Sequence, residues 1–374
     1  MNQSLHDDDE RTNLAILTMH DEHRPFRGNH FNFIDLIKKG RELGAFVYVL
    51  TAKDIKRRAH KWNGYVYNAE TKSWTRQLLP LPHVMYNRIP TRKDEMLPEV
   101  QRKIRFCLKQ DSVRVFNPAF FNKWTLFEWL NKSKATKKFI PATKRLTSPD
   151  DLESFLALHH DIYLKPVRGK AGKGIMKVQA LPGQRLPYRL SIQNARKSHH
   201  SHHGTIARLW STFKQQIDGE DYLMQQAIAL TSYNKRPFDL RVLVQKNQYG
   251  EWTISGIGAR VAGRSSITTH VPRGGSIDEP EKLLSLAYGQ EAAKLTLQRV
   301  HQAAHMIARQ IERASGQTLG EMSMDLGIDN ARRIWFFEAN SRPMKFDEPD
   351  IRKRSLERII QFSQYLARTK TRSR

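Results

Sequence analysis

The residues most suited to chemistry lie in a predicted β-hairpin near the C-terminal end of the sequence. Its two strands are predicted over 322–328 and 334–340. Side chains alternate across a strand, so Glu338 and Asn340 share one face, and the expected pairing places Asp325 directly opposite Glu338. Two carboxylates and one amide oxygen then converge. Hard oxygen ligands of this kind suit Mg²⁺, which fills its other positions with water and phosphate oxygens.

This predicted register assumes that the pairing of the two strands is centred between Ala331 and Arg332. The apolar run 334–337 indicates that the polar groups interrupt a core strand, where an unpaired carboxylate is costly. The alternative is a capped strand end in which Asn340 makes a turn.

A second pattern joins a lysine to a basic, glycine-rich segment. Lys165 ends a predicted strand and is followed by three glycines and two lysines: Gly169, Lys170, Gly172, Lys173 and Gly174. Glycines let backbone amides approach phosphate oxygens and lysines supply charge, so the segment is predicted to cover phosphates. It fails the Walker A pattern, because Ile175 follows the last glycine, and it fails the dinucleotide fingerprint. A basic glycine turn without a ligand is the alternative.

Arginines on two neighbouring predicted strands form a third pattern. Asp239 and Arg241 lie on one face of a strand over 238–245, and Arg260 and Arg264 follow on the next strand and its exit. Such arginines hold a carboxylate bidentately or stabilise charge on a transferred phosphoryl group. A structural ion pair between Arg241 and Asp239 or a neighbouring strand is the alternative.

The elements that precede these patterns predict a small parallel α/β domain. Apolar runs at 14–17 and 46–50 flank a helical pattern that ends near Gly44. Further strands are predicted at 64–68 and 83–89.

The rest of the chain is predicted to form a second unit, which contains all three patterns. It begins with a helix over 123–131, a basic linker and a helix capped by Ser148. Antiparallel strands are predicted at 222–226, 238–245 and 252–261. A long helix that stops at Gly316 precedes the hairpin, and a last helix covers 351–367.

A histidine cluster ends the polar stretch 183–204, which is predicted to be an exposed loop. Its members are His199, His200, His202 and His203. Closely spaced imidazoles suit Zn²⁺ or Ni²⁺, but the favoured interpretation is an incidental polar loop.

Composition limits the classes of function. The 63 Lys and Arg against 37 Asp and Glu give a net charge of +26, which attracts nucleotides, nucleic acid or other polyanions. Nucleic acid is not favoured, because no recognition motif is present and the aromatic residues follow apolar patterns. Cys107 is the only cysteine, which excludes an intramolecular disulfide and a thiolate zinc cluster. No signal peptide or membrane span is predicted, so we expect a cytoplasmic protein.

In this order the segments resemble the ATP-grasp superfamily, and across nearly the whole chain they most resemble its spore-coat-associated YheC/YheD group. The resemblance is carried by Asn117–Pro118, Lys123–Trp124, Tyr163–Pro166 with the glycine loop, Tyr222–Gln226, Asp239–Arg241, Arg273–Gly275 and Phe337–Asn340. It implies an α/β fold with a pre-ATP-grasp domain over 1–117 and a two-lobed ATP-grasp module with antiparallel sheets over 118–368. The lid subdomain would cover about 137–226, followed by a basic tail at 369–374.

The resemblance also implies roles for individual residues in binding ATP and Mg²⁺. Lys123 and Lys165 match the lysines that hold the α- and β-phosphates, and the loop 169–174 matches the lid over the triphosphate. The hinge whose backbone reads adenine matches Gln225, Gln226, Ala227 and Ile228.

The remaining expected site residues lie near the γ-phosphate. Asp325, Glu338 and Asn340 match the Mg²⁺ ligands. Arg241 matches the arginine beside the γ-phosphate, and we expect Arg260 to act with it and Asp239 to contribute to nucleotide binding.

The implied activity is that of an ATP-dependent carboxylate–amine ligase that forms an acyl phosphate. His270 stands where peptide-ligase relatives carry Asn, which favours the alternative of a non-catalytic nucleotide-binding protein associated with a spore coat or other assembly. The family's acceptor substrate is expected to approach Met85–Arg88, for which an ordinary strand end is the alternative.

Overall fold

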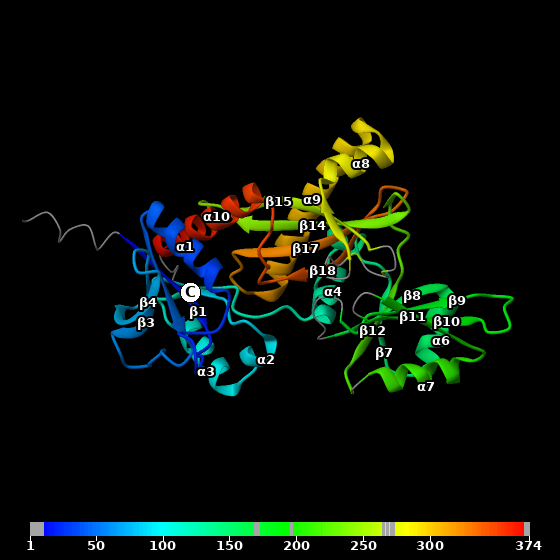
Figure 1. Ribbon diagram of the computed structural model, residues 1–374, viewed down its shortest axis with the longest axis horizontal. Helices are drawn as coiled ribbons and strands as arrows, with labels where there is room; N and C mark the ends of the chain where they lie inside the picture. Colours follow the sequence, from blue (N-terminus) through cyan, green and yellow to red (C-terminus); the bar gives the residue numbers. More distant parts are fainter. Residues whose placement is uncertain are drawn as a thin grey trace, which may run out of the picture.

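Three β-sheets follow one another along the long axis of the molecule (Figure 1). The computed structural model describes residues 11–167, 173–194, 197–217, 219–263, 266, 269 and 274–369. Mixed α/β layers of this kind confirm the predicted fold class. Within the described residues, none of the helices is sufficiently long and apolar to span a bilayer.

The N-terminal sheet has the order β4-β3-β2-β1-β5-β6. Its strands are β1 (Thr12–Thr18), β2 (Ala45–Thr51), β3 (Lys61–Asn68), β4 (Ser73–Pro80), β5 (Val84–Asn87) and β6 (Arg114–Phe116). The strands β2, β1, β5 and β6 are parallel, which confirms the predicted β-α-β opening. The helices of this region are α1 (His30–Glu42), α2 (Arg92–Glu95) and α3 (Pro98–Leu108). The sequence patterns did not predict β4, because Leu79 is the only buried residue in it.

The lid sheet has the order β11-β10-β9-β8-β12-β7, with every neighbouring pair antiparallel. Its strands are β7 (Thr143–Leu146), β8 (Asp161–Pro166), β9 (Met176–Ala180), β10 (Tyr188–Asn194), β11 (Lys197–His203) and β12 (Tyr222–Gln226). The helices α6 (Pro149–Leu158) and α7 (Ile206–Gln216) share its apolar core.

The prediction of an exposed loop over residues 183–204 is wrong, because β10 and β11 form an antiparallel hairpin there. Leu190 is fully buried and Ile192 packs against the lid core, two residues apart on one face of β10. This short alternation supplies enough apolar surface to hold an otherwise polar hairpin at the edge of the sheet.

The central sheet has the order β16-β15-β14-β17-β18, with β13 paired to β14. Its strands are β13 (Ser232–Tyr233), β14 (Arg236–Lys246), β15 (Trp252–Val261), β16 (Ser276–Asp278), β17 (Glu321–Ile328) and β18 (Ile334–Asn340). The helices around it are α4 (Lys123–Asn131), α5 (Lys134–Lys137), α8 (Pro280–Tyr288) and α9 (Gln290–Ser315). The long helix α9 ends at Gly316 in the left-handed conformation, as predicted, and buries its apolar stripe against β14, β15 and β17.

The last helix, α10 (Pro349–Arg368), returns to the N-terminal sheet and lies beside α1 (Figure 1). Ile359, Ile360 and Phe362 belong to the same apolar core as Leu14 and Phe33. The C-terminal helix therefore completes the apolar core of the N-terminal sheet. The predicted boundary at residue 117 stays a prediction.

A β-bulge in β18 changes the register of the hairpin that β17 and β18 form. Asp325 lies opposite Glu338, as predicted, but the pairs nearer to the turn are shifted by one residue, so the predicted centre of pairing is wrong there. The shift leaves Phe337 as the extra residue on β18. Phe336 and Ala339 both enter the core although three positions separate them, which strict alternation does not allow.

Candidate nucleotide-binding site

A cavity of about 310 Å³ lies between the lid sheet and the central sheet. The lid side contributes Thr143, Tyr163, Lys165, Ile175, Lys177, Leu223, Gln225, Gln226, Ile228 and Ala229. The other side contributes Lys123, Phe127, Leu230, Pro237, Asp239, Thr269, Asp325, Phe337 and Glu338. Polar groups from distant parts of the sequence thus face one cavity, which is typical of a ligand site.

Two lysines place positive charge in this cavity. Lys165 on β8 donates a hydrogen bond to Oε1 of Gln225, and its Nζ lies 5.4 Å from the ring centroid of Phe337. Burial and, to a smaller extent, the charge of Lys123 lower the pKa of Lys165 to about 8, although Glu338, Asp325 and Asp239 oppose the shift. Lys123, buried at the start of α4, places its Nζ 3.5 Å from Oε2 of Glu338.

Two carboxylates face these lysines from the hairpin. Asp325 is buried and Glu338 is partly exposed, and both line the cavity. The bulge at Phe337 directs Phe337 and Glu338 to the same wall. Asn340 is exposed, pairs in register with Ser323 and does not line the cavity, so the structure brings together two of the three expected metal ligands.

Arg260 is held between two aspartates. Its Nε and Nη2 each lie 2.9 Å from a carboxylate oxygen of Asp239, and Nη2 also lies 2.9 Å from Oδ2 of Asp325. Burial opposes the charge, but both aspartates outweigh it and raise the pKa of Arg260. Thr269 donates a further hydrogen bond to Asp239. Arg260 therefore links the carboxylates of Asp239 and Asp325.

Arg241 lies outside the cavity lining, although it pairs in register with Asp325. Its guanidinium stacks over Phe346, with 5.1 Å to the ring centroid. Its buried Nε has no hydrogen-bond partner within the described residues. The alternative of an Arg241–Asp239 ion pair is wrong, because Arg260 takes both oxygens of that carboxylate.

The expected hinge lies along the cavity. Gln225, Gln226 and Ile228 line it, whereas Ala227 does not. The backbone N–H groups of Gln226 and Ala227 already donate to carbonyls of the lid. An adenine base bound here would therefore contact groups of the hinge other than these two N–H groups.

Several expected residues lie outside the described part of the chain. These are Gly169, Lys170, Gly172, Arg264, His270 and Arg273. Gly174 is described: its φ is +77°, and its carbonyl accepts a hydrogen bond from the hydroxyl of Tyr222.

The histidines of β11 do not form a metal site with other described residues, since no group of three His, Cys, Asp or Glu side chains is placed to hold an ion there. His200 and His202 lie on one face of the strand and His199 and His203 on the other. The alternation of side chains along β11 therefore divides the four histidines between the two faces of the strand.

Some cavity residues were not predicted from the sequence. Thr143 accepts a hydrogen bond from Gln225, and Lys177 lies 2.9 Å from a carboxylate oxygen of Asp161. Thr143 carries no distinctive spacing in the sequence. For Lys177, the alternation of β9 beside β8 was the available signal.

A family model described as YheC/D-like ATP-grasp matches residues 112–366. The chain belongs to the YheC/D-like ATP-grasp family. Among its relatives, the endospore coat-associated protein YheD of Bacillus subtilis (strain 168) is 28% identical over 359 residues, which is 92% of this chain and 76% of YheD. The endospore coat-associated protein YheC of the same organism is 21% identical over 313 residues, 83% of this chain and 84% of YheC.

Solved structures share the fold of this family member. The VanG D-Ala:D-Ser ligase from Enterococcus faecalis aligns with a TM-score of 0.53 and 12% identity, over 95% of this chain and 99% of that chain. The ATP-grasp ligase PsnB, solved with a minimal precursor, aligns with a TM-score of 0.50 and 12% identity, over 89% and 91%. At these identities the likeness concerns the ATP-grasp fold alone.

Proposed function

We propose that this YheC/D-like protein is an ATP-dependent carboxylate–amine ligase that uses MgATP in the cavity between the lid and central sheets. The observation that carries the proposal is that Lys123 and Lys165 face Asp325 and Glu338 across one cavity. Cations for phosphate oxygens and oxygen ligands for a divalent ion are the two requirements of a metal–nucleotide site.

The donor set fits Mg²⁺, which is commonly held by one or two carboxylates together with substrate phosphates. Asp325 and Glu338 would hold the ion, and the bound ion would neutralise phosphate charge. Lys165 and Lys123 would hold phosphate oxygens, and Arg260 keeps the Asp325 carboxylate in place.

The proposed reaction has two steps. In the first, a carboxylate oxygen of the acid attacks the γ-phosphorus, the bond between the γ-phosphorus and the bridging oxygen breaks, and ADP leaves with that electron pair. In the second, an amine nitrogen attacks the carbonyl carbon of the acyl phosphate, phosphate departs and the nitrogen loses a proton. The protein contributes positioning and charge neutralisation.

The test is acid-dependent release of ADP by the purified protein, compared among wild type, Glu338→Gln and Asn340→Ala. We expect Glu338→Gln to lower the rate at least about a hundredfold, because it removes an ionised metal ligand. Asn340→Ala should keep most of the activity, since Asn340 is exposed and outside the cavity lining. Equal losses in the two variants would contradict the proposed metal site.

The second candidate is a nucleotide-binding protein without turnover, associated with a spore coat or another assembly. It is favoured by the names of the Bacillus subtilis relatives. A single-turnover experiment with excess protein discriminates between the two: a pure binder returns unaltered ATP after long incubation with each acid and amine tested.

A further inference from the structure

A buried asparagine joins the N-terminal sheet to the two strands that carry Asp325 and Glu338. Asn117 directly follows β6, is fully buried and has a left-handed backbone, with a φ of +51°. Few residues other than glycine adopt this conformation, and asparagine is one that tolerates it. The side-chain amide of Asn117 bonds to groups that lie 203 to 224 residues away in the chain. The left-handed backbone is thus held by contacts with a distant part of the fold.

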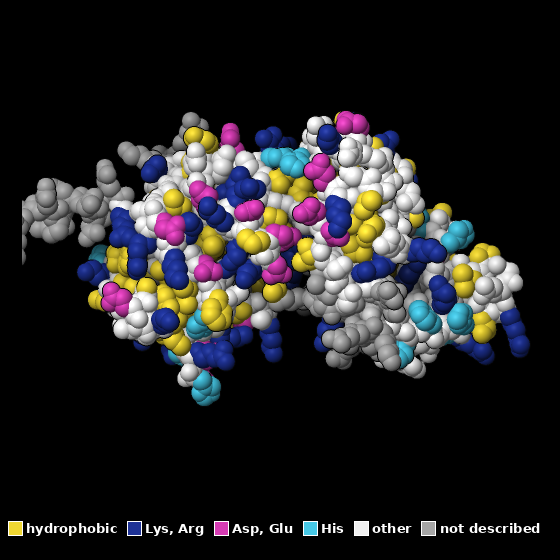
Figure 2. Space-filling model, turned by 45° about the horizontal axis from the view of Figure 1, so that its top comes forward, with side chains coloured by type: hydrophobic (Ala, Val, Ile, Leu, Met, Phe, Trp, Pro, Cys, Tyr) yellow, Lys and Arg dark blue, Asp and Glu magenta, His cyan; other side chains and the backbone are white. Residues whose placement is uncertain are grey.

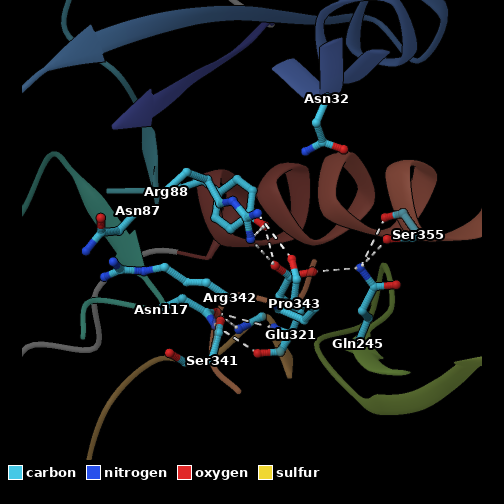
Figure 3. A network of polar contacts seen from close by, with 12 residues as sticks. Asn32, Asn87, Arg88, Asn117, Gln245, Glu321, Ser341, Arg342, Pro343 and Ser355 are labelled. Atoms are coloured by element: carbon cyan, nitrogen blue, oxygen red, sulfur yellow. Dashed lines mark hydrogen bonds and ion pairs between the residues drawn. The ribbon is translucent and has the colours of Figure 1, made fainter. Parts of the chain in front are cut away.

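The amide of Asn117 contacts both strands of the hairpin at its open end, which is the end away from the turn at residues 329–333 (Figure 3). Its Nδ2 donates to the carbonyl of Glu321, 2.8 Å away at the start of β17, and to the carbonyl of Ser341, directly after β18. Its Oδ1 accepts from the backbone N–H groups of Gly320, at 2.8 Å, and of Glu321, at 3.3 Å. Both donors and both acceptor positions of the amide are therefore in use.

The β-bulge separates the metal-site pair from the hairpin turn. On the open side of the bulge the ladder has three pairs, which are Ser323 with Asn340, Met324 with Ala339, and Asp325 with Glu338. The turn sets the register only on its own side, because the register shifts by one residue at the bulge. A slip of one residue in the three open-side pairs would turn the Glu338 side chain to the other face of the sheet. The geometry of the metal site therefore depends on contacts at the open end.

The strand that such a slip would move is β18. The neighbouring strand β17 pairs with β14 over seven consecutive residues, which fixes it in the middle of the sheet. In contrast, β18 is the edge strand of the described sheet and pairs there with β17. Ser341, which accepts a hydrogen bond from Asn117, lies only three residues after Glu338. Asn117 thus holds the end of β18 against the start of β17.

Asn117 is itself fixed by the N-terminal sheet. Asn87 on β5 donates to the carbonyl of Pro118, 2.8 Å away, and the hydroxyl of Ser341 donates to the carbonyl of Ala119, 2.9 Å away. All of the side chains in these contacts come from buried residues, where hydrogen bonds are costly to break. The N-terminal sheet therefore provides a rigid reference for the register of β18.

We propose that Asn117 is a positioning residue for the metal site, because it sets the register of the three open-side pairs and so keeps Glu338 opposite Asp325. The inference rests on the proposed function and adds to it a residue that the Mg²⁺ site requires without touching the ion or the nucleotide. Lys123 and Lys165 belong to α4 and β8, outside the hairpin. The share of ATP affinity that comes from these lysines should therefore not fall when Asn117 is replaced.

The test compares the wild type with Asn117→Gly, which removes the amide and tolerates the left-handed backbone. Asn234→Gly is the matched control, since Asn234 has a φ of +49° but is exposed in the turn between β13 and β14. Calorimetry on the full-length protein measures ATP binding in excess EDTA and in Mg²⁺, and the ratio of the two affinities is the gain due to metal. Hydrogen exchange followed by mass spectrometry measures the hairpin without any ligand.

We expect Asn117→Gly to lower the gain due to metal about tenfold, as is typical when a partner that orients a metal ligand is lost. Affinity for metal-free ATP should not fall. Hydrogen exchange should become faster at residues 338–341 and stay unchanged at 334–336, on the turn side of the bulge. Asn234→Gly should match the wild type in all three measurements.

Asn117→Asp is the second variant, in case Asn117→Gly does not fold. It keeps the acceptor for Gly320 but places an acceptor against the carbonyl of Ser341, so the same loss is expected. Circular dichroism shows whether each variant folds. An unchanged gain due to metal in a folded variant, or an equal loss of ATP affinity with and without Mg²⁺, would overturn the positioning role. A wild type that binds ATP no more tightly with Mg²⁺ than without it would instead overturn the proposed function and this inference with it.

Discussion

Single residues in the nucleotide cavity differ in how far their charge is neutralised by the protein itself. Arg260 is engaged by Asp239 and Asp325, whereas Lys165 donates a hydrogen bond to a neutral amide, that of Gln225. A buried cation without a direct counter-ion has a lower pKa than one in an ion pair, so it loses its proton at a lower pH. Lys165 is therefore the residue through which pH should act on phosphate binding.

Binding of MgATP should weaken as pH rises through the pKa of Lys165, which burial lowers to about 8. The cationic form, which attracts phosphate, exists below that pKa and is lost above it. Bound phosphate favours the cation, so the midpoint in the complex lies higher. Calorimetric dissociation constants between about pH 6 and 10 measure the effect.

Lys165→Arg is the matched control, because an arginine stays charged over this whole range. Its affinity profile should be flat above neutral pH. A profile with the same pH dependence in the wild type and in Lys165→Arg would assign the titration to another group.

Arg260→Leu should destabilise the fold by about 3 to 5 kcal/mol, because it leaves Asp239 and Asp325 buried without their counter-ion. Arg333→Leu is the control: its side chain is 68% exposed in an ion pair with Asp329, and the ion pair itself should be worth at most about 1 kcal/mol. Urea unfolding measures both. Similar losses in the two variants would contradict the positioning role of Arg260.

Among the elements, the bulged strand β18 decides the shape of the cavity wall. Phe337 fits against Gly327 on β17, where a Cβ atom would lie 2.5 Å from the phenyl ring. The glycine therefore allows the extra residue of the bulge to lie flat beside Glu338. Such bulges are found next to functional sites, where they redirect a side chain.

Gly327→Ala should lower the free energy of unfolding by about 1 to 3 kcal/mol through overpacking, and should weaken MgATP binding because Phe337 must shift. Gly204→Ala is the matched control, since the added Cβ meets only an ordinary contact with Leu186 at 3.5 Å. Denaturation and calorimetry measure the two effects. Unchanged affinity in Gly327→Ala would show that the wall tolerates the shift.

At the scale of the whole molecule, the C-terminal helix packs on the N-terminal sheet. Phe362 on α10 contacts Phe116 on β6, with ring centroids 5.5 Å apart, so the last helix holds the first sheet. The charge, by contrast, is distributed: Figure 2 shows Lys and Arg side chains spread over both halves of the visible face among acidic and apolar ones.

Phe362→Ala should cost about 3 to 5 kcal/mol of unfolding free energy, because it leaves a cavity between α10 and the N-terminal sheet. Leu286→Ala is the control, as that side chain is 62% exposed and should change stability by no more than about 0.5 kcal/mol. Tryptophan fluorescence during urea unfolding is the measurement. A loss as small as that of the control would show that α10 is not part of the core.

The sequence by itself determined many of the elements and one decisive pair. Periodicity and turn signals are local, so they predicted β12, α4 and the long helix, and alternation in a tight hairpin predicted that Asp325 lies opposite Glu338. The glycine loop and His270 remain predictions, because they lie outside the described residues.

The tertiary structure alone decided which distant groups meet. The partners of Arg260, the exclusion of Asn340 from the cavity lining and the docking of α10 on the first sheet all depend on contacts between segments far apart in the chain. Sequence patterns record the spacing along one element, whereas packing between elements fixes the distances on which charge pairing and ligand binding depend.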